Sequence, residues 1–295
     1  MSDAFALQYR EIDGDSRVAA TFNERSVAAE TIAAGVQRQR LLDRGRVAHT
    51  RIFLDRLSLS PRASTALDVA NADIAWVQVL HGSATLKSGD ADAALDEKHI
   101  VFIPPGFTGT LSTPSGAVIL CATVPQAARF DPALANAAPP LRVVDWTCEP
   151  VLASEHDARK RIYVATPALF GTKAIKGEMI IYPPGTQAPS HHHEGAEHFM
   201  YVLRGRGTAY ANEKPLPVSE GDLIYYDECE RHYLKSEGDE DMVFVEFFVP
   251  GQYRTVWTPG ANVCTWNPTG RTISGGQPVR DIRGHSSALP TPQDV

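Results

Sequence analysis

The sequence predicts an all-β protein built from two tandem barrels, and two observations carry this prediction. The first is a series of short apolar runs bounded by Gly and Pro, such as "WVQVLHGSATL" from Trp76 and "MVFVEFFVP" from Met242. Regularly spaced short strands with such turns are typical of a sandwich or barrel. Helical periodicity is weak, and the best candidate for a helix is the segment 23–35.

The second observation is an internal repeat. A shift of 123 residues places "WVQVLHGSATL" from Trp76 on "FMYVLRGRGTA" from Phe199, and the turn glycines Gly82 and Gly205 then coincide. Self-similarity at a fixed spacing indicates copies of one structural unit. The stretch "ALANAAPPLR" from Ala133 is small and Pro-rich, as linkers often are.

These features divide the chain into five predicted regions. They are an N-terminal arm, a first barrel, a linker, a second barrel and a C-terminal tail, at residues 1–35, 36–132, 133–145, 146–252 and 253–295. The tail contains two Trp and has no strong period, so we expect it to pack on a barrel or on a neighbouring subunit.

Composition excludes several kinds of partner. The formal charge of −7 argues against nucleic acid, because phosphate binding requires a basic surface. No apolar run approaches the roughly 18 residues that cross a bilayer, so we expect no membrane partner. The N-terminus lacks a signal pattern and the four cysteines show no CxxC pair. We therefore expect a cytoplasmic protein with reduced thiols.

Four of the ten histidines are crowded into "HHHEGAEH". On an extended segment His191 and His193 place their imidazoles on one face, because side chains alternate along a strand. His198 enters from the adjoining strand, and His232 comes from a strand distant in sequence. Four converging imidazoles suit a divalent transition metal. His192 lies between two of these ligands and should point away from the metal.

The spacings resemble the two motifs of the cupin family. The first motif, Gly-x5-His-x-His followed by a third ligand and, six residues later, Gly, runs here from Gly185 to Gly205. The second reads "GDLIYYDECERH" and ends at His232, with Asp227 and Cys229 in place of the usual Pro and Gly. The resemblance implies two tandem cupin barrels of the double-stranded β-helix, or jelly-roll, type with short helices.

The third ligand of the first motif has two candidates. Glu is the commoner family residue at this place, and the spacing from His193 also permits Glu197. The six-residue count to Gly205 favours His198. Alternation favours His198 too, since only one of two adjacent strand residues points inward. Glu197 then faces outward or lies at the rim of the site.

The first barrel is expected to hold no metal. Under the 123-residue shift the four histidines fall on Asp68, Ala70, Ala75 and Gly109. Only one of these four positions offers a metal ligand. We therefore expect the first barrel to bury apolar surface against the second.

Further residues are candidates for the chemistry of the site. Glu246 lies in an otherwise apolar strand, where a carboxylate is costly to bury unless it is paired, so it is a candidate general base. Tyr226 is a candidate to hydrogen-bond substrate, and Glu197 is a candidate catalytic group at the rim. Met200 and Arg204 share the parity of His198, and Arg204 could hold a substrate carboxylate.

Three classes of function stay open. The family resemblance and the histidine ligands favour an oxidoreductase, a dioxygenase that cleaves a ring or C–C bond. The alternative is a metal-dependent hydrolase, lyase or isomerase, because "EHFMYVLRGRGTAYANEKPLPVSEGDLIYYDE" is similar to the manganese-bearing half of ureidoglycine aminohydrolases. The third class is a binding bicupin without catalysis.

The cofactor and partners follow from the same reading. One divalent transition metal is expected, with Fe or Mn favoured and Ni, Cu or Zn open. A shell of neutral imidazoles leaves the full charge on the ion, which favours a small anionic substrate. Family analogy predicts a homodimer.

Overall fold

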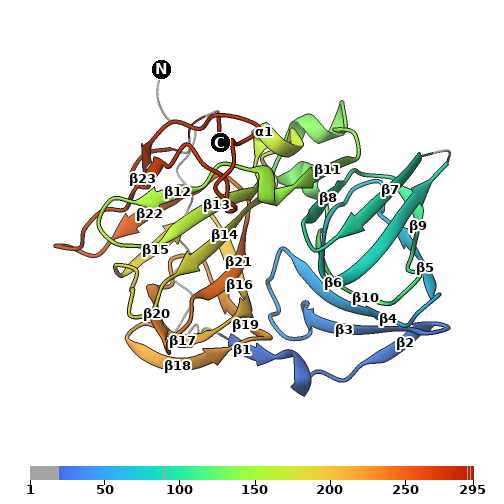
Figure 1. Cartoon of the computed structure of the whole chain (residues 1–295), viewed down its shortest axis with the longest axis horizontal. Coiled ribbons are helices and arrows are strands. Elements are labelled where there is room, and N and C mark those ends of the chain that lie inside the picture. Colours follow the sequence, from blue (N-terminus) through green and yellow to red (C-terminus); the bar gives the residue numbers. More distant parts are fainter. Residues whose placement is uncertain (1–19, 90, 291, 293) are drawn as a thin grey trace.

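Two β-barrels lie side by side in the computed structural model, which describes residues 20–89, 91–290, 292 and 294–295 (Figure 1). The all-β prediction is confirmed. The helices in this part of the chain are short: α1 (Pro167–Phe170) and the 3-10 turns η1 (Glu24–Ser26), η2 (Ala127–Arg129), η3 (Pro132–Ala135) and η4 (Trp146–Cys148).

The first barrel consists of a large sheet with strand order β11-β8-β6-β10-β4-β3-β2 and a smaller set, β5, β9 and β7, attached through β6. Its strands are β2 (Glu30–Ala33), β3 (Val36–Leu42), β4 (Phe53–Leu59), β5 (Ser64–Asp68), β6 (Ile74–Ser88), β7 (Ala91–Asp96), β8 (His99–Ile103), β9 (Thr108–Ser112), β10 (Ala117–Val124) and β11 (Arg142–Asp145). Apolar side chains that alternate along these strands, such as Val77, Ile103 and Leu111, form one buried cluster inside this barrel.

The second barrel pairs a long sheet, ordered β1-β19-β16-β21-β14-β13-β12-β23-β24, with a shorter one, ordered β18-β17-β20-β15-β22. Its strands are β1 (Ala20–Asn23), β12 (Leu152–Ser154), β13 (Lys160–Ala165), β14 (Lys176–Tyr182), β15 (His191–Glu194), β16 (Glu197–Arg204), β17 (Arg206–Ala211), β18 (Lys214–Ser219), β19 (Asp222–Tyr226), β20 (His232–Glu237), β21 (Met242–Val249), β22 (Arg254–Trp257), β23 (Thr265–Pro268) and β24 (His285–Ser286).

The 123-residue repeat reappears in the strand bounds. β4 and β14 begin and end 123 residues apart, and so do β8 and β19. Gly82 and Gly205 occupy the same turn, with φ of 81° and 79°. A Cβ at either glycine would collide with a backbone carbonyl, of Gly116 in one barrel and Asp241 in the other, so both turns require glycine.

The barrels share one apolar layer between their long sheets. Trp76 and Phe102 of the first barrel and Phe199 and Phe247 of the second belong to a single buried cluster. The rings of Trp76 and Phe247 meet edge to face, with centroids 4.2 Å apart. Strands such as β16 are therefore buried on both faces, which explains their almost continuous apolar sequence.

The helix predicted at 23–35 is wrong. These residues form the end of β1, the turn η1 and strand β2. Asn23 caps the short 3-10 turn by accepting from the backbone N–H of Arg25, and the chain then returns to extended structure. β1 pairs with β19 of the second barrel whereas β2 pairs with β3 of the first, so pairing between strands outweighs the local helical preference of the alanines.

The predicted arm, linker and tail all contribute strands. Residues 1–19 of the arm lie outside the described residues. β11 of the linker pairs with β8, while β22 and β23 of the tail pair with β15 and β12 of the second barrel.

Candidate metal centre

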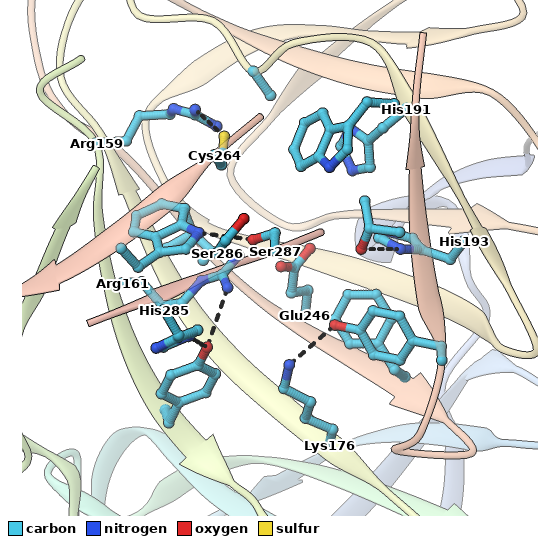
Figure 2. Close-up of a pocket in the computed structure, with 18 of the residues that line it drawn as sticks. Arg159, Arg161, Lys176, His191, His193, Glu246, Cys264, His285, Ser286 and Ser287 are labelled. Atoms are coloured by element: carbon cyan, nitrogen blue, oxygen red, sulfur yellow. Dashed lines mark hydrogen bonds between the residues drawn. The ribbon is translucent and has the colours of Figure 1, made fainter. Parts of the chain in front are cut away.

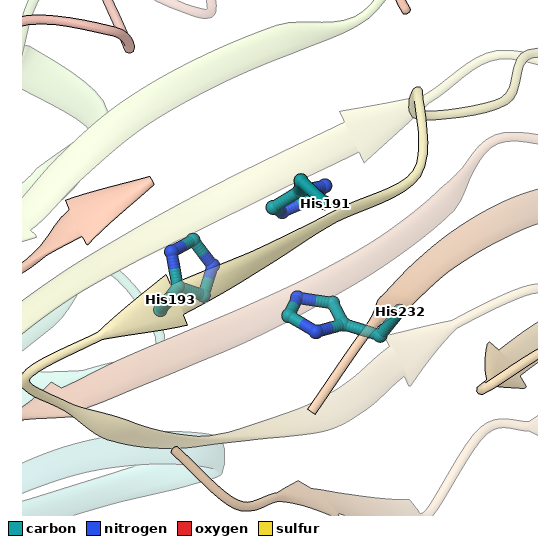
Figure 3. Close-up of side chains that lie close together, drawn as sticks. All are labelled: His191, His193 and His232. Atoms are coloured by element: carbon teal, nitrogen blue, oxygen red, sulfur yellow. The ribbon is translucent and has the colours of Figure 1, made fainter. Parts of the chain in front are cut away.

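Three histidines from two strands meet inside the second barrel (Figure 3). His191 and His193 lie on β15, and His232 begins β20 directly opposite His191 in the antiparallel pairing. Their ligand nitrogens lie within 4.8 Å of one another. Alternation along β15 thus places two imidazoles on one face, and strand pairing supplies the third.

His198 approaches the same cluster from β16 on the opposite sheet. Its ring centroid lies 4.6 Å from that of His232 and 4.9 Å from that of His193. The side chain is buried, and its Nε2 has no hydrogen-bond partner among the described residues. The structure therefore brings together the four histidines that the sequence predicts as ligands.

Backbone carbonyls orient two of the imidazoles. His191 Nδ1 lies 2.8 Å from the carbonyl of Pro189, and His232 Nδ1 lies 2.7 Å from the carbonyl of Glu230. A carbonyl only accepts, so each Nδ1 carries the proton and each Nε2 presents a lone pair. The Nε2 of His232 is buried without a partner in the part of the chain that the structure describes.

Burial keeps the imidazoles neutral. Desolvation lowers the pKa of His191 to about 4 and holds the pKa values of His193, His198 and His232 well below the usual range. Metal ligation requires neutral imidazole. Buried nitrogen lone pairs without partners fit a divalent transition metal, because hard cations such as Ca²⁺ prefer oxygen ligands.

The turn before His232 keeps its shape despite the unusual residues in the second motif. Cys229 adopts φ of 65°, close to the 72° of its counterpart Gly106 in the first barrel. Its N–H donates to the carbonyl of His193 at 2.8 Å, which ties the two motifs together. This bond helps to offset the cost of a left-handed conformation at a residue with a Cβ.

Glu197, a predicted catalytic group and alternative ligand, lies on the other face of β16. Its carboxylate accepts from Thr50 Oγ1 at 3.0 Å and from Tyr225 OH at 2.8 Å. Thr50 belongs to the first barrel, so Glu197 is a buried anchor between the barrels. Glu197 faces away from the histidine cluster because side chains alternate along β16 and its neighbour His198 points inward.

Arg204, predicted to bind substrate, is exposed at the end of β16 and lies away from the histidines. It borders a groove that also contains Trp146 and Arg56, outside the second barrel. The side chain of Arg204 does not point inward as that of His198 does, because the pairing of β16 with β21 shifts register between Val202 and Arg204.

A cavity of about 70 Å³ opens beside the histidines (Figure 2). His191 and His193 form one wall, and Glu246 and Met200 project from the long sheet. Residues of the tail, including Trp257, Cys264, Trp266 and His285, close another side.

Tyr226 lies against the histidines outside the lining of this cavity. Its ring stacks on that of His232 with centroids 4.3 Å apart, and its hydroxyl is buried without a partner among residues 20–89, 91–290, 292 and 294–295. This position supports the orientation of His232 and does not place the hydroxyl on the cavity wall.

Glu246 is the carboxyl group that lines the cavity. Burial, together with the neighbouring carboxylate of Glu178, raises the pKa of Glu246 to about 8. Burial opposes the charge of Glu178, but Arg161 and Lys176 hold its pKa below the usual range. Two adjacent carboxyl groups thus differ in protonation at neutral pH, which is a common arrangement at catalytic sites.

Arg161 and Lys176 are functional candidates that the sequence predictions missed. Both line the cavity, from β13 and β14. One sequence pattern could have indicated them: the charged residues Lys176 and Glu178 stand at alternate positions of a strand that is otherwise apolar. The two Trp of the tail predicted that it packs on a barrel or on a neighbouring subunit, but no pattern predicted that it closes the cavity.

Fold and cluster together define a protein of two β-barrels with a histidine-lined metal site in one of them. Residues 178–248 match the family described as "Cupin domain". The second barrel is a cupin domain, and the chain as a whole has the bicupin fold.

Two curated proteins are similar to parts of this chain. An oxalate-binding protein from Thermotoga maritima is 33% identical over 67 residues, which are 23% of this chain and 55% of that protein. Oxalate decarboxylase OxdC from Bacillus subtilis is 26% identical over 102 residues, which are 32% of this chain and 26% of that protein. The matched segments thus span less than two thirds of either relative.

Solved structures share the fold over most of the chain. A mutant of the Bacillus oxalate decarboxylase superimposes with a TM-score of 0.66 at 16% identity, covering 84% of this chain and 81% of the other. That decarboxylase has Mn(II) centres. Protein Ylba from E. coli gives a TM-score of 0.62 at 15% identity, covering 78% and 90%. Among the described residues, no helix combines the length and apolar character needed to cross a membrane.

Proposed function

We propose that this protein is a metal-dependent cupin enzyme that removes CO₂ from a small carboxylate, with oxalate as the first candidate substrate. The observation that carries the proposal is the small cavity onto which both the histidine cluster and a protonatable carboxyl group, Glu246, open. The names of the two curated relatives support the choice of oxalate. The size of the cavity also suits a small substrate such as oxalate, since about 70 Å³ corresponds to roughly five to seven water positions.

The four histidines would hold the metal, His191 and His232 through Nε2, with His191, His193 and His232 as the core of the set. A divalent ion held there would bind and polarise a substrate carboxylate. Manganese is the first metal to test, because the similar decarboxylase has Mn(II) centres, and iron is the second.

Glu246 would supply the proton that decarboxylation needs. When a carboxylate leaves as CO₂, the electron pair of the broken C–C bond stays on the remaining carbon, and that carbon takes up a proton. A carboxyl group with a pKa of about 8 is protonated at neutral pH and can donate. The apolar walls around it, including Phe248 and Met200, limit competing protonation by water.

The dioxygenase prediction retains one observation in its favour, the cluster of four neutral imidazoles without a carboxylate. Substrate and oxygen consumption distinguish the two functions. Untagged protein loaded with Mn(II) or Fe(II) is incubated with oxalate, and formate, CO₂ and dissolved O₂ are followed together. We expect one formate and one CO₂ per oxalate without net O₂ consumption.

Three results would contradict the decarboxylase proposal. Stoichiometric O₂ consumption with a diketone or aromatic substrate would favour the dioxygenase. Saturable oxalate binding with no product from either metal would favour a binding protein. Ammonia release from a ureido substrate would point to the aminohydrolase alternative.

The role of Glu246 predicts a pH profile. The protonated form predominates below about pH 8 and is lost as the pH rises through that value, so kcat should fall on the alkaline side. Glu246→Gln should lower kcat by roughly 100-fold or more, because general acid catalysis contributes about 10²–10⁴-fold. Glu240→Gln, at an exposed position, is the matched control. An active Glu246→Gln variant with the same alkaline limb would contradict this role.

A further inference from the structure

The wall of the cavity across from the histidines is cationic. Arg161 and Arg159 project from β13 and the segment before it, and Lys176 projects from β14. Figure 2 shows Glu246 between this group and His193. Of the cavity-lining residues that the structure describes, Glu246 is the one with a carboxyl group, against three permanent cations.

Carboxylates that do not line the cavity form ion pairs with these cations. Glu178 lies 2.8 Å from Arg161 Nε and 2.9 Å from Lys176 Nζ, and it is fully buried without lining the cavity. Asp157 pairs in the same way with Arg159 at 2.7 Å. One carboxylate thus serves two cations, Arg161 and Lys176, which leaves the wall that faces the cavity with an excess of positive charge.

Neutral hydroxyl groups complete this wall. Lys176 Nζ donates to Tyr253 OH at 3.2 Å, and Arg161 donates to Tyr163 OH at 3.3 Å. Tyr163 OH lies 2.6 Å from His285 Nε2, and His285 Nδ1 faces the carbonyl of Arg283, so the hydroxyl donates to the imidazole. Burial lowers the pKa of His285, so it adds no further charge.

The cationic wall and the histidine cluster are close neighbours. The hydroxyl of Tyr253 accepts from Lys176 Nζ, and the centroid of the same ring lies 4.9 Å from that of His193. A small molecule in the cavity therefore reaches both. The limited volume excludes a large aromatic ring with substituents.

We infer that Arg161 and Lys176 form a second anion subsite, which binds one carboxylate of a small dicarboxylate while the other carboxylate lies at the histidine cluster. A planar guanidinium beside an ammonium is well suited to a carboxylate. The inference rests on the proposed function for the substrate carboxylate that lies at the metal. The binding of the other carboxylate by Arg161 and Lys176 does not depend on that function. It makes the enzyme selective for a dianion over a monocarboxylate.

The test measures binding by calorimetry in protein loaded with Mn(II), using malonate and acetate as probes. Wild-type protein should bind malonate at least tenfold more tightly than acetate. Arg161→Gln removes the guanidinium and leaves Glu178 paired with Lys176, so the wall loses its excess positive charge and malonate binding should weaken at least tenfold. Arg204→Gln, an exposed arginine outside the cavity, should bind malonate like the wild type.

A second variant provides an independent test if Arg161→Gln does not fold. Lys176→Met leaves the pair of Arg161 and Glu178 intact and should also weaken malonate binding. Equal affinity for malonate and acetate, or wild-type malonate affinity in the folded variants, would overturn the subsite. Metal content of the same variants, measured separately, should stay at the wild-type level, so failure of the metal site and failure of the subsite give different results.

Discussion

Alanine in place of His232 is expected to leave the purified, untagged protein almost free of transition metal. The imidazole contributes a buried Nε2 that has no other partner in the described chain and that faces a neutral site. Loss of an outer-shell partner alone costs about 10–100-fold in metal affinity, so loss of a ligand should cost more than roughly 100-fold. Metal content by mass spectrometry and affinity by competition with a chelator measure the effect.

Two neighbouring variants are the controls for this prediction. His192→Ala should keep its metal, because the His192 side chain lies 3.6 Å from Glu194 instead of in the cluster. Glu197→Gln should keep its metal too but lose stability, since the new amide NH₂ would replace an oxygen that now accepts a hydrogen bond, either from Thr50 or from Tyr225. Full metal content in His232→Ala, or metal loss in Glu197→Gln, would show that the ligand set is different.

Trp76→Ala is expected to be the most damaging single change for stability. The side chain is 1% exposed and lies in the apolar layer between the barrels, against Phe247. Truncation of a buried Trp costs about 3–5 kcal/mol, because contacts are lost and a cavity is left. The indole Nε1 has no hydrogen-bond partner among the described residues, so the cost is one of packing.

Urea denaturation followed by circular dichroism measures this change. The midpoint should fall clearly for Trp76→Ala, whereas Val279→Ala, at a position that is 67% exposed, should unfold like the wild type. An unchanged midpoint for Trp76→Ala would mean that the layer between the barrels contributes little to stability.

The sequence predicted those parts of the molecule that depend on local periodicity. Period-two alternation identified the strands, the repeat located their counterparts, and His191, His193 and His232 followed from the spacing of the motifs. Alternation also favoured His198 over Glu197, and the structure places only the former in the cluster. The domain boundaries and the homodimer stay predictions.

The remaining parts depend on contacts between distant segments, which no local pattern encodes. The prediction that Arg204 faces inward extends the alternation of β16 past a register shift. The partners of Glu197 lie 147 residues away at Thr50 and 28 away at Tyr225. The cationic wall requires β13, β14 and the tail to be brought together, and only the folded chain does this.

The tail has a consequence for how the site is assembled during translation. Trp257, Cys264, Trp266 and His285 are all synthesised after the four clustered histidines, yet they close one side of the cavity. While the tail of a nascent chain is still inside the exit tunnel of the ribosome, this side of the chamber is therefore open to bulk water. The chamber is complete only once this closing segment has emerged and β22 has paired with β15, so the histidine-bearing strand gains its last neighbour late in synthesis.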